Sequence, residues 1–451
     1  MIYVHVPFCR SFCTYCDFYS EVVGGCRQSL PGTWPPAATG SGVRQEVGGG
    51  LVAFSGKNAT NPGLKAGVSS KNGLFCDQPQ REATLFERYT DDICAEIRAR
   101  RDEIAAADGV RTLYIGGGTP SVLPFECLLK IVECLETVEG SLHAGRDNST
   151  VIPSAVEGSG LWQEFTVEVN PEDIVERGAD YVRDLLALGV NRISMGVQSL
   201  DDGMLRWMNR RHSADGARGA WRIISEVGQG KPLAPGQHRQ LNRSVDLISG
   251  VPGMDLAMLE KTVDEVLQWR PEHISAYQLS VEDGSALAEM IARGQVAELP
   301  DEDCRAQYDL LCRKLAAAGY HHYEISNWAL PGHEAVHNSA YWTRQPYVGL
   351  GPGAHSLEIL PHQKRPKTSG PLKKNLGGPS KSAENDGAPG PEQQIRKWNS
   401  KRTTGWAEEG REVLSPEEIR EETVMLLART DRGPIPESDW FVADDLIAYL
   451  M

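Results

Sequence analysis

The sequence has no long apolar run and begins without the features of a secretory signal peptide. Its first ten residues, MIYVHVPFCR, contain no basic region, extended apolar stretch or small-residue cleavage site. No apolar run approaches the roughly 18 residues that a membrane-spanning helix needs. Basic residues are also in deficit, because 46 Lys and Arg face 61 Asp and Glu and the formal net charge is −15. We therefore expect a cytoplasmic protein with no integral membrane segment and no nucleic-acid partner, since phosphate binding requires a basic surface.

Ten cysteines occur in the chain, but a disulfide framework is not expected in a reducing compartment. Cys127 and Cys134 lie seven residues apart in the helical pattern ECLLKIVECLETV, which places both on one face of a helix. They are expected to belong to the core. The three cysteines that cluster near the N-terminus are not explained in this way.

Six short runs have the composition of β-strands and are separated by amphipathic helical patterns. The strands are expected at Ile2–Val6, Thr112–Ile115, Phe165–Asn170, Arg192–Gln198, Ser244–Ile248 and His273–Leu279. The helices are expected at Arg81–Ala106, Phe125–Val138, Asp173–Leu188, Asp201–His212, Asp215–Val227 and Asp255–Trp269. Strands that alternate with helices favour right-handed βαβ units and a parallel sheet. Six units predict a partial (β/α)6 barrel, whereas a full barrel has eight.

The 451 residues are enough for two or three domains. We expect the barrel over residues 1–300 and a smaller C-terminal α+β or helical domain over residues 301–451. The second region contains a helical pattern at Glu302–Ala318 and a capping-box helix start at Ser415. Four stretches rich in Gly, Pro, Ser, Asn and Lys predict surface insertions, at about residues 21–80, 140–163, 228–243 and 357–395.

Side-chain alternation predicts that the inside of the barrel is polar. In the third strand Glu168 lies on the face opposite Val167, in the fourth Gln198 lies opposite Val197, and in the fifth Asp246 is on the polar face. In the first strand Tyr3 lies on the polar face. A purely structural barrel fills its interior with branched apolar residues. The polar lining therefore favours a bound polar ligand.

The three clustered cysteines, Cys9, Cys13 and Cys16, follow the first strand with CxxxCxxC spacing. Thiolates are the ligands that iron–sulfur clusters require. Three of them hold three corners of a 4Fe–4S cluster and leave one iron without a protein ligand. Zinc is the main alternative, but a structural zinc site has four ligands and no second cysteine pair is present. Buried, unreactive cysteines are a third interpretation, which three cysteines in eight residues do not favour.

This cysteine spacing after a first strand resembles the radical S-adenosylmethionine superfamily. The resemblance covers most of the chain outside the insertions and points to the branch that contains oxygen-independent coproporphyrinogen oxidase and the heme chaperone HemW. It is carried by YVHVPFCRSFCTYCDF, YIGGGTPS, EVNPE, NRISMGVQS, DLISGVPG and EHISAYQLSVEDG. The resemblance implies that S-adenosylmethionine chelates the open iron of a 4Fe–4S cluster held by Cys9, Cys13 and Cys16.

The resemblance also implies contacts of the chain with S-adenosylmethionine. Gly117, Gly118 and Thr119 match the segment that binds the methionine amino group, where glycines let the backbone approach a ligand. Tyr3 is expected near the cluster and the cofactor, and Tyr15 on the adenine side. The remaining polar cofactor contacts are expected from Glu168, Gln198, Arg210 and Asp246.

Two features separate the members of this branch. Coproporphyrinogen oxidases resemble CxxxCxxCxC and carry an N-terminal extension, whereas here Phe18 stands at the fourth cysteine position and Tyr3 is near the start. The motif HNxxYW of HemW, associated there with heme binding, is matched by His337, Asn338, Tyr341 and Trp342. A histidine is a common axial ligand of heme iron. Lesser ligand candidates are His321, His322 and His355.

We therefore expect a heme chaperone that binds a 4Fe–4S cluster, S-adenosylmethionine and heme, without established catalytic turnover. By family analogy it passes heme to acceptor proteins such as respiratory heme proteins at the membrane, so peripheral membrane association is also expected. The alternative is radical oxidative decarboxylation of coproporphyrinogen III in porphyrin biosynthesis. A binding module with a purely structural cluster is a third hypothesis. Only about twenty residues follow Thr430, so the end of the C-terminal domain is expected to be short.

Overall fold

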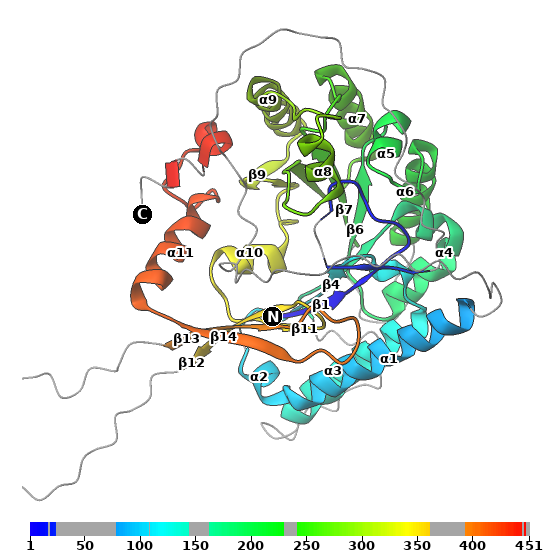
Figure 1. Ribbon diagram of the computed structural model, residues 1–451, viewed down its shortest axis with the longest axis vertical. Coiled ribbons are helices and arrows are strands. Elements are labelled where there is room, and N and C mark those ends of the chain that lie inside the picture. Colours follow the sequence, from blue (N-terminus) through cyan, green and yellow to red (C-terminus); the bar gives the residue numbers. More distant parts are fainter. Residues whose placement is uncertain are drawn as a thin grey trace, which may run out of the picture.

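A computed structural model describes residues 1–16, 19–23, 78–107, 109–143, 162–229, 241–360, 393–443 and 446–447 (Figure 1). Most of each predicted insertion, and Phe18, lie outside the described residues. Where the structure does describe the insertions' edges, they belong to regular elements. The clearest case is residues 357–360, which we expected in an insertion and which form the end of strand β12 (His355–Leu360).

The centre of the molecule is a nine-stranded, mostly parallel sheet in the order β11-β1-β4-β5-β6-β7-β8-β10-β9. Six successive parallel strands match the six predicted ones: β1 (Ile2–Val6), β4 (Thr112–Gly117), β5 (Glu164–Val169), β6 (Arg192–Gln198), β7 (Asn242–Ser249) and β8 (His273–Gln278). The predicted α/β fold with a parallel sheet is confirmed. Because these strands are parallel, their carboxyl ends meet at one edge, where such sheets bind ligands.

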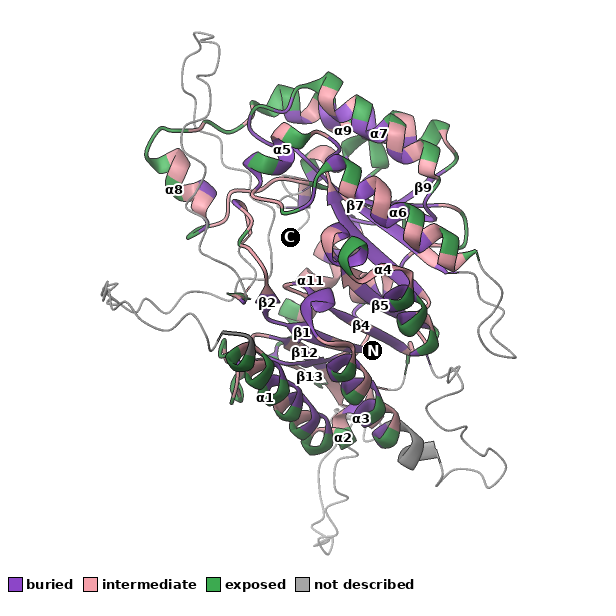
Figure 2. Cartoon of the chain, turned by 90° about the vertical axis from the view of Figure 1, so that its right-hand side faces the viewer, coloured by how far each residue is buried: buried purple, intermediate pink, exposed green. Residues whose placement is uncertain are grey.

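Helices cover the outer face of the sheet, so that its strands are buried while the helices keep an exposed side (Figure 2). Val4, Ile115 and Val167 point to this layer and are fully buried, and each such side chain contributes about 1.5–3 kcal/mol. The helices up to this point of the chain are α1 (Gln78–Ala99), α2 (Arg101–Ala106), α3 (Phe125–His143), α4 (Pro171–Ala187), α5 (Asp202–Trp207), α6 (Ala214–Gly228), α7 (Leu256–Trp269), α8 (Ala286–Ala292) and α9 (Asp301–Ala317), with a 3-10 turn η1 (Pro120–Val122). Of these, α8 stands apart from the layer on the sheet (Figure 2), and its Leu287 N–H donates to the Thr14 carbonyl in the loop that contains the three clustered cysteines.

Two helix predictions were wrong in their extent. The helix expected at Arg81–Ala106 is divided at Arg100, whose φ and ψ are −103° and 19° and whose guanidinium donates to the Gly349 carbonyl at 2.7 Å. The helix expected through His212 ends after Trp207, because Asn209 adopts a left-handed backbone with φ 57°. The first break coincides with a tertiary contact, and the second with a turn that leads into α6.

The later part of the chain adds strands to both edges of the same sheet. Strand β11 (Val348–Leu350) is parallel to β1, while β10 (Asn327–Ala329) lies antiparallel between β8 and β9 (His321–Glu324). The short strands β2 (Phe8–Cys9) and β3 (Glu21–Val22) pair with each other. The remaining elements are α10 (Val336–Trp342), β12 (His355–Leu360), β13 (Gln393–Asn399), β14 (Glu408–Leu414), α11 (Pro416–Ala428) and η2 (Glu437–Val442). The capping box predicted at Ser415 is confirmed at the start of α11. The boundary near residue 300 stays a prediction.

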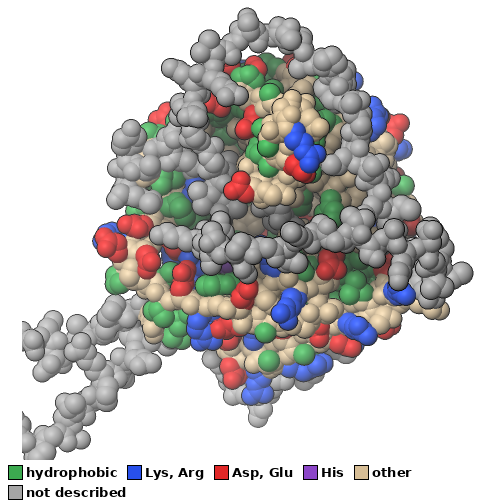
Figure 3. Space-filling view, in the orientation of Figure 1, with side chains coloured by type: hydrophobic (Ala, Val, Ile, Leu, Met, Phe, Trp, Pro, Cys, Tyr) green, Lys and Arg blue, Asp and Glu red, His purple; other side chains and the backbone are tan. Residues whose placement is uncertain are grey.

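The surface carries both signs of charge. On the face drawn in Figure 3, acidic and basic side chains are interspersed over the described elements. None of the helices in the described part of the chain is both long enough and apolar enough to cross a bilayer.

Candidate cofactor site

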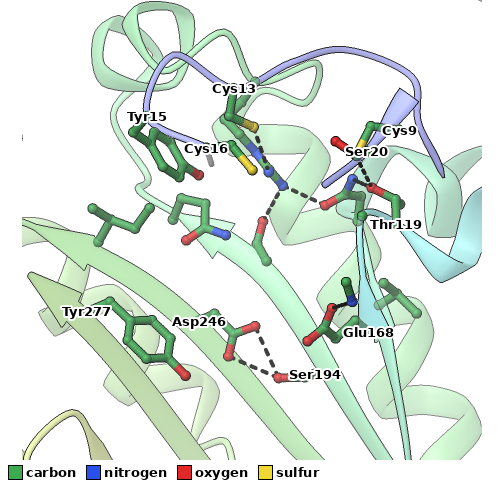
Figure 4. Close-up of a pocket in the computed structure, with 18 of the residues that line it drawn as sticks. Cys9, Cys13, Tyr15, Cys16, Ser20, Thr119, Glu168, Ser194, Asp246 and Tyr277 are labelled. Atoms are coloured by element: carbon green, nitrogen blue, oxygen red, sulfur yellow. Dashed lines mark hydrogen bonds between the residues drawn. The ribbon is translucent and has the colours of Figure 1, made fainter. Parts of the chain in front are cut away.

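A cavity of about 510 Å³ opens where the six parallel strands end (Figure 4). It brings together twelve of the residues predicted to bind a ligand: Cys9, Cys13, Tyr15, Cys16, Gly117, Gly118, Thr119, Glu168, Gln198, Arg210, Asp246 and Asn338. Figure 4 shows the cysteines at one end, with Asp246 and Ser194 farther along the strands. A cavity of this size, with polar groups converging from several strands, is typical of a small-molecule site.

The three cysteines sit on a loop that is tied to α5. Thr14 anchors the loop by donating its hydroxyl to the Trp207 carbonyl at 2.8 Å. Arg210 Nη1 donates to Cys13 Sγ at 3.5 Å, and Thr119 Oγ1 donates to Cys9 Sγ at 3.6 Å. Burial raises the pKa of the Cys9 thiol, while its hydrogen bond from Thr119 and the charge of Arg210 act in the opposite direction.

These thiols fit three corners of a 4Fe–4S cluster, because all three are partly open to the cavity, and those of Cys9 and Cys13 accept hydrogen bonds from Thr119 and Arg210. Within the described residues, no three His, Cys, Asp or Glu side chains are gathered as ligands of a single metal ion would be. Thiolates at separate corners of a cluster are spaced more widely than ligands of one ion. The cysteine ligand set itself stays a prediction.

Backbone space at the end of β4 explains the run of three glycines. A Cβ at Gly118 would lie 2.6 Å from the Phe8 carbonyl oxygen and 2.9 Å from that of Val6. The Gly118 N–H donates to the same Val6 oxygen at 2.8 Å. Gly117 has φ 110°, and a Cβ there would lie 2.4 Å from the His5 ring. Glycine thus lets the end of β4 pack directly against the start of the cysteine loop.

Two carboxyl groups reach into the cavity from neighbouring strands. Glu168 accepts hydrogen bonds from the Tyr114 hydroxyl at 2.6 Å and the Gly117 N–H at 3.0 Å. Burial, reinforced by the charge of Asp246, raises the pKa of Glu168 to about 7. Asp246 accepts from Ser194 at 2.9 Å, and burial raises its pKa as well. The side chains of Glu168 and Asp246 are partly exposed, and both line the cavity. A cationic ligand would therefore be favoured there.

Arg210 links the carboxyl ends of the strands to the cysteine loop. Besides Cys13 it donates to Asn170 Oδ1 at 2.6 Å and to the Gly196 carbonyl at 2.9 Å. A Cβ at Gly196 would lie 3.2 Å from the guanidinium, so glycine gives this side chain room. Gln198 at the end of β6 has φ 65°, a left-handed conformation that is uncommon for a residue other than glycine and concentrates at ligand sites.

The chain resembles known proteins along most of its length. Residues 74–266 match the family model described as the radical SAM superfamily. The heme chaperone HemW of Bacillus subtilis is 32% identical over 353 residues, which are 78% of this chain and 69% of that protein. HemW of Mycobacterium tuberculosis strain H37Rv is 31% identical, over 78% of this chain and 68% of that protein. The chain belongs to the HemW family of radical SAM proteins. The resemblance seen in the sequence motifs is therefore confirmed.

A solved structure agrees with this fold. Coproporphyrinogen III oxidase of Escherichia coli, described as a radical SAM enzyme, aligns with a TM-score of 0.57 over 95% of this chain and 75% of that one. At 15% identity this likeness concerns the fold alone.

The segment that matches the HNxxYW motif of the HemW family lies on α10 and is only partly in the cavity. Asn338 lines it, whereas His337, Tyr341 and Trp342 do not. His337 is 1% exposed, and its Nδ1 and Nε2 are hydrogen-bonded to Thr112 Oγ1 at 2.7 Å and to the Tyr341 hydroxyl at 3.1 Å. Burial lowers the pKa of His337 to about 3, so the ring is neutral. In this conformation neither ring nitrogen is open to a metal.

The other predicted ligands also lie outside the cavity. Tyr3 does not line it, and its hydroxyl is 2.9 Å from His5 Nδ1. His322 stacks on Trp328 with ring centroids 4.0 Å apart and contacts Glu437 at 2.8 Å. His321 pairs with acidic side chains near the surface, and His355 stacks on Trp398. The proposed ligand roles of these residues stay predictions.

Many residues that line the cavity were not singled out from the sequence, among them three with large polar side chains. Tyr114, Arg192 and Tyr277 all line the cavity. Arg192 and Ser194 share a strand face with Gln198, so the alternation that selected Gln198 contained a signal for Arg192 as well.

Proposed function

We propose that this protein binds a 4Fe–4S cluster, S-adenosylmethionine and heme, and that it passes heme to an acceptor protein. We call residues 337–342, which match the HNxxYW motif, the heme segment. The observation that carries the proposal is the cavity in which the CxxxCxxC loop, the triple-glycine turn and Asn338 of the heme segment meet. Membership of the HemW family supports the heme part, because curated relatives are named heme chaperones. A reduced cluster, when bound, would supply an electron to the sulfonium of S-adenosylmethionine.

The residues of the chain have distinct tasks in this proposal. Cys9, Cys13 and Cys16 would hold three irons, and Arg210 would stabilise the thiolate of Cys13. Glu168 would accept the methionine amino group, since its carboxylate already accepts from the Gly117 N–H at the glycine turn. The walls of the cavity would exclude bulk water from the cofactor.

Cofactor binding should depend on pH through Glu168. Its carboxylate accepts hydrogen bonds and its protonated form does not, so S-adenosylmethionine should bind about tenfold more weakly at pH 6 than at pH 8, with a midpoint near 7. Tyr3, Tyr114 and Tyr277 also face this group, but burial holds their pKa values above neutral pH. Equilibrium dialysis of the reconstituted, unreduced protein measures the affinity. Glu168→Gln should bind weakly and without this pH dependence; if Asp246→Asn alone removed the dependence, the assignment to Glu168 would be wrong.

Heme binding should depend on His337 and on the hydroxyl that holds its Nε2. We expect His337→Ala to bind heme at least about tenfold more weakly, since one tenfold step is about 1.4 kcal/mol and an axial ligand is lost. Tyr341→Phe keeps the shape of the ring but frees Nε2, so it should bind heme as tightly as the wild type or more tightly. Anaerobic heme titration followed by absorption measures both variants.

An assay of coproporphyrinogen III turnover distinguishes a heme chaperone from a coproporphyrinogen oxidase. The same preparation, supplied with S-adenosylmethionine, a reductant and coproporphyrinogen III, should form no protoporphyrinogen beyond the level without protein. Robust formation of protoporphyrinogen would contradict the proposal, whatever the heme titration shows.

A further inference from the structure

Arg192, the first residue of β6, is a charged side chain with no partner. It lines the cavity and is only 3% exposed. Its Nη1 is buried, and the guanidinium makes no hydrogen bond to any residue that the structure describes. An arginine side chain stays protonated under all ordinary conditions. A buried charge of this kind is costly unless an anion compensates for it.

The surrounding residues do not supply that anion through direct contact. Thr166 and Asn242, which pair with Arg192 in register on the two flanking strands, form no hydrogen bond with it. Asp246 is the carboxylate whose charge couples to Arg192, but its oxygens accept from Ser194 at 2.9 and 3.1 Å. Thr166 Oγ1 is itself buried without a partner. Within the described residues, the part of the cavity around Arg192, which we call its floor, thus contains buried polar groups without hydrogen-bond partners.

Arg192 lies far from the cysteine loop. Along β6 the cavity is lined by Arg192, Ser194, Gly196 and Gln198, and only Gln198 is at the carboxyl end, where the loop lies. Six residues of strand span about 20 Å. The cysteine end already has Arg210, which contacts Cys13. A carboxylate of the cofactor that reaches the cluster is therefore served by Arg210, and Arg192 remains for a different ligand.

We propose that Arg192 binds a carboxylate of the second ligand, so that the floor of the cavity is a subsite for a propionate group of a tetrapyrrole. This inference rests on the proposed function, which supplies heme as the ligand with carboxylate side chains. Asn338 lines the same cavity, so the heme segment and Arg192 face a common space. Arginine suits this task because its planar fork matches a carboxylate.

Esterification of the ligand provides the test. Hemin and hemin dimethyl ester, which has no free carboxylate, are titrated anaerobically into the wild type, Arg192→Gln, Arg192→Lys and the surface control Arg222→Gln. The wild type and the control should prefer hemin by about 10- to 100-fold. Arg192→Gln should bind both compounds equally, at the affinity of the wild type for the ester, and Arg192→Lys should show an intermediate preference. S-adenosylmethionine affinity should be unchanged in all variants.

The ligand-free protein gives a second readout. Because the buried guanidinium of Arg192 has no direct partner among the described residues, Arg192→Gln should leave the Tm of the ligand-free protein unchanged or raise it. A fall of several degrees would show that Arg192 is structural and would overturn the inference. If Arg192→Gln still preferred hemin as strongly as the wild type does, the inference would also be overturned. The proposed function would remain intact in that case. Weaker binding of S-adenosylmethionine alone would assign the carboxylate to the cofactor. If the wild type bound neither hemin compound, the proposed function itself would fail.

Discussion

Replacing Cys13 with alanine should abolish the visible absorption of the anaerobically reconstituted protein. Two thiolates on the loop cannot hold three corners of a 4Fe–4S cluster, and the variant should retain little iron or sulfide. Arg210, which donates to Cys13 Sγ, would in addition face an empty position. Absorption spectra together with iron and acid-labile sulfide analysis measure the loss, which should be almost complete.

Cys94→Ala is the matched control for this experiment. Cys94 is buried in α1, where its Sγ donates to the Lys130 carbonyl at 3.7 Å, outside the cavity. This variant should keep the full spectrum. An unchanged spectrum in Cys13→Ala would refute the ligand assignment. Uptake of zinc in place of iron and sulfide by the wild type, under oxygen-free conditions, would refute the cluster altogether.

Gly118→Ala should reduce both stability and cofactor binding, although it adds a single methyl group. That methyl would lie within 3 Å of the Phe8 and Val6 carbonyl oxygens, which are backbone atoms and cannot rotate away. We expect a loss of about 1–3 kcal/mol or more, or roughly 1 °C in Tm for each kcal/mol if the whole chain unfolds together. The cysteine loop follows these residues directly, so cluster content and S-adenosylmethionine affinity should fall as well. Thermal unfolding and dialysis measure the two effects.

Gly219→Ala provides the comparison. Gly219 lies within α6, and a Cβ there would be 3.5 Å from Val175 Cγ2, an ordinary van der Waals distance. Alanine favours a helix more than glycine by up to about 1 kcal/mol, so this variant should be as stable as the wild type or more stable. Equal Tm values for Gly118→Ala and the wild type would mean that the backbone of β4 and the loop separates easily, contrary to the packing described.

The strands and the cavity residues could be predicted because their signals are local. Alternation along β5 to β7 placed Glu168, Gln198 and Asp246 on the inner face, and all three line the cavity. The division of the first helix at Arg100 could not be predicted in this way, since it coincides with a hydrogen bond from Arg100 to Gly349, almost 250 positions away. Such contacts exist only once the chain has folded.

The position of His337 was equally inaccessible to sequence reasoning. The motif indicates which residues belong together but not that both ring nitrogens are already bonded, one of them to Thr112 on β4. Arg192 was not singled out because the sequence does not show which buried side chains lack a hydrogen-bond partner. Its lack of a partner becomes visible only when all neighbouring strands are in place.

The strands that flank α10 restrict how the heme segment can move. Residues 330–335 connect it to β10 at one margin of the sheet, and residues 343–347 connect it to β11 at the other. The Glu164 carboxylate also accepts from the first N–H groups of α10, at 2.9 Å for both Val336 and His337. These contacts fix both ends of α10 in the fold. We therefore expect the His337 imidazole to become accessible through rotation of side chains such as Tyr341, whose hydroxyl lies 3.1 Å from Nε2, and not through movement of the whole helix.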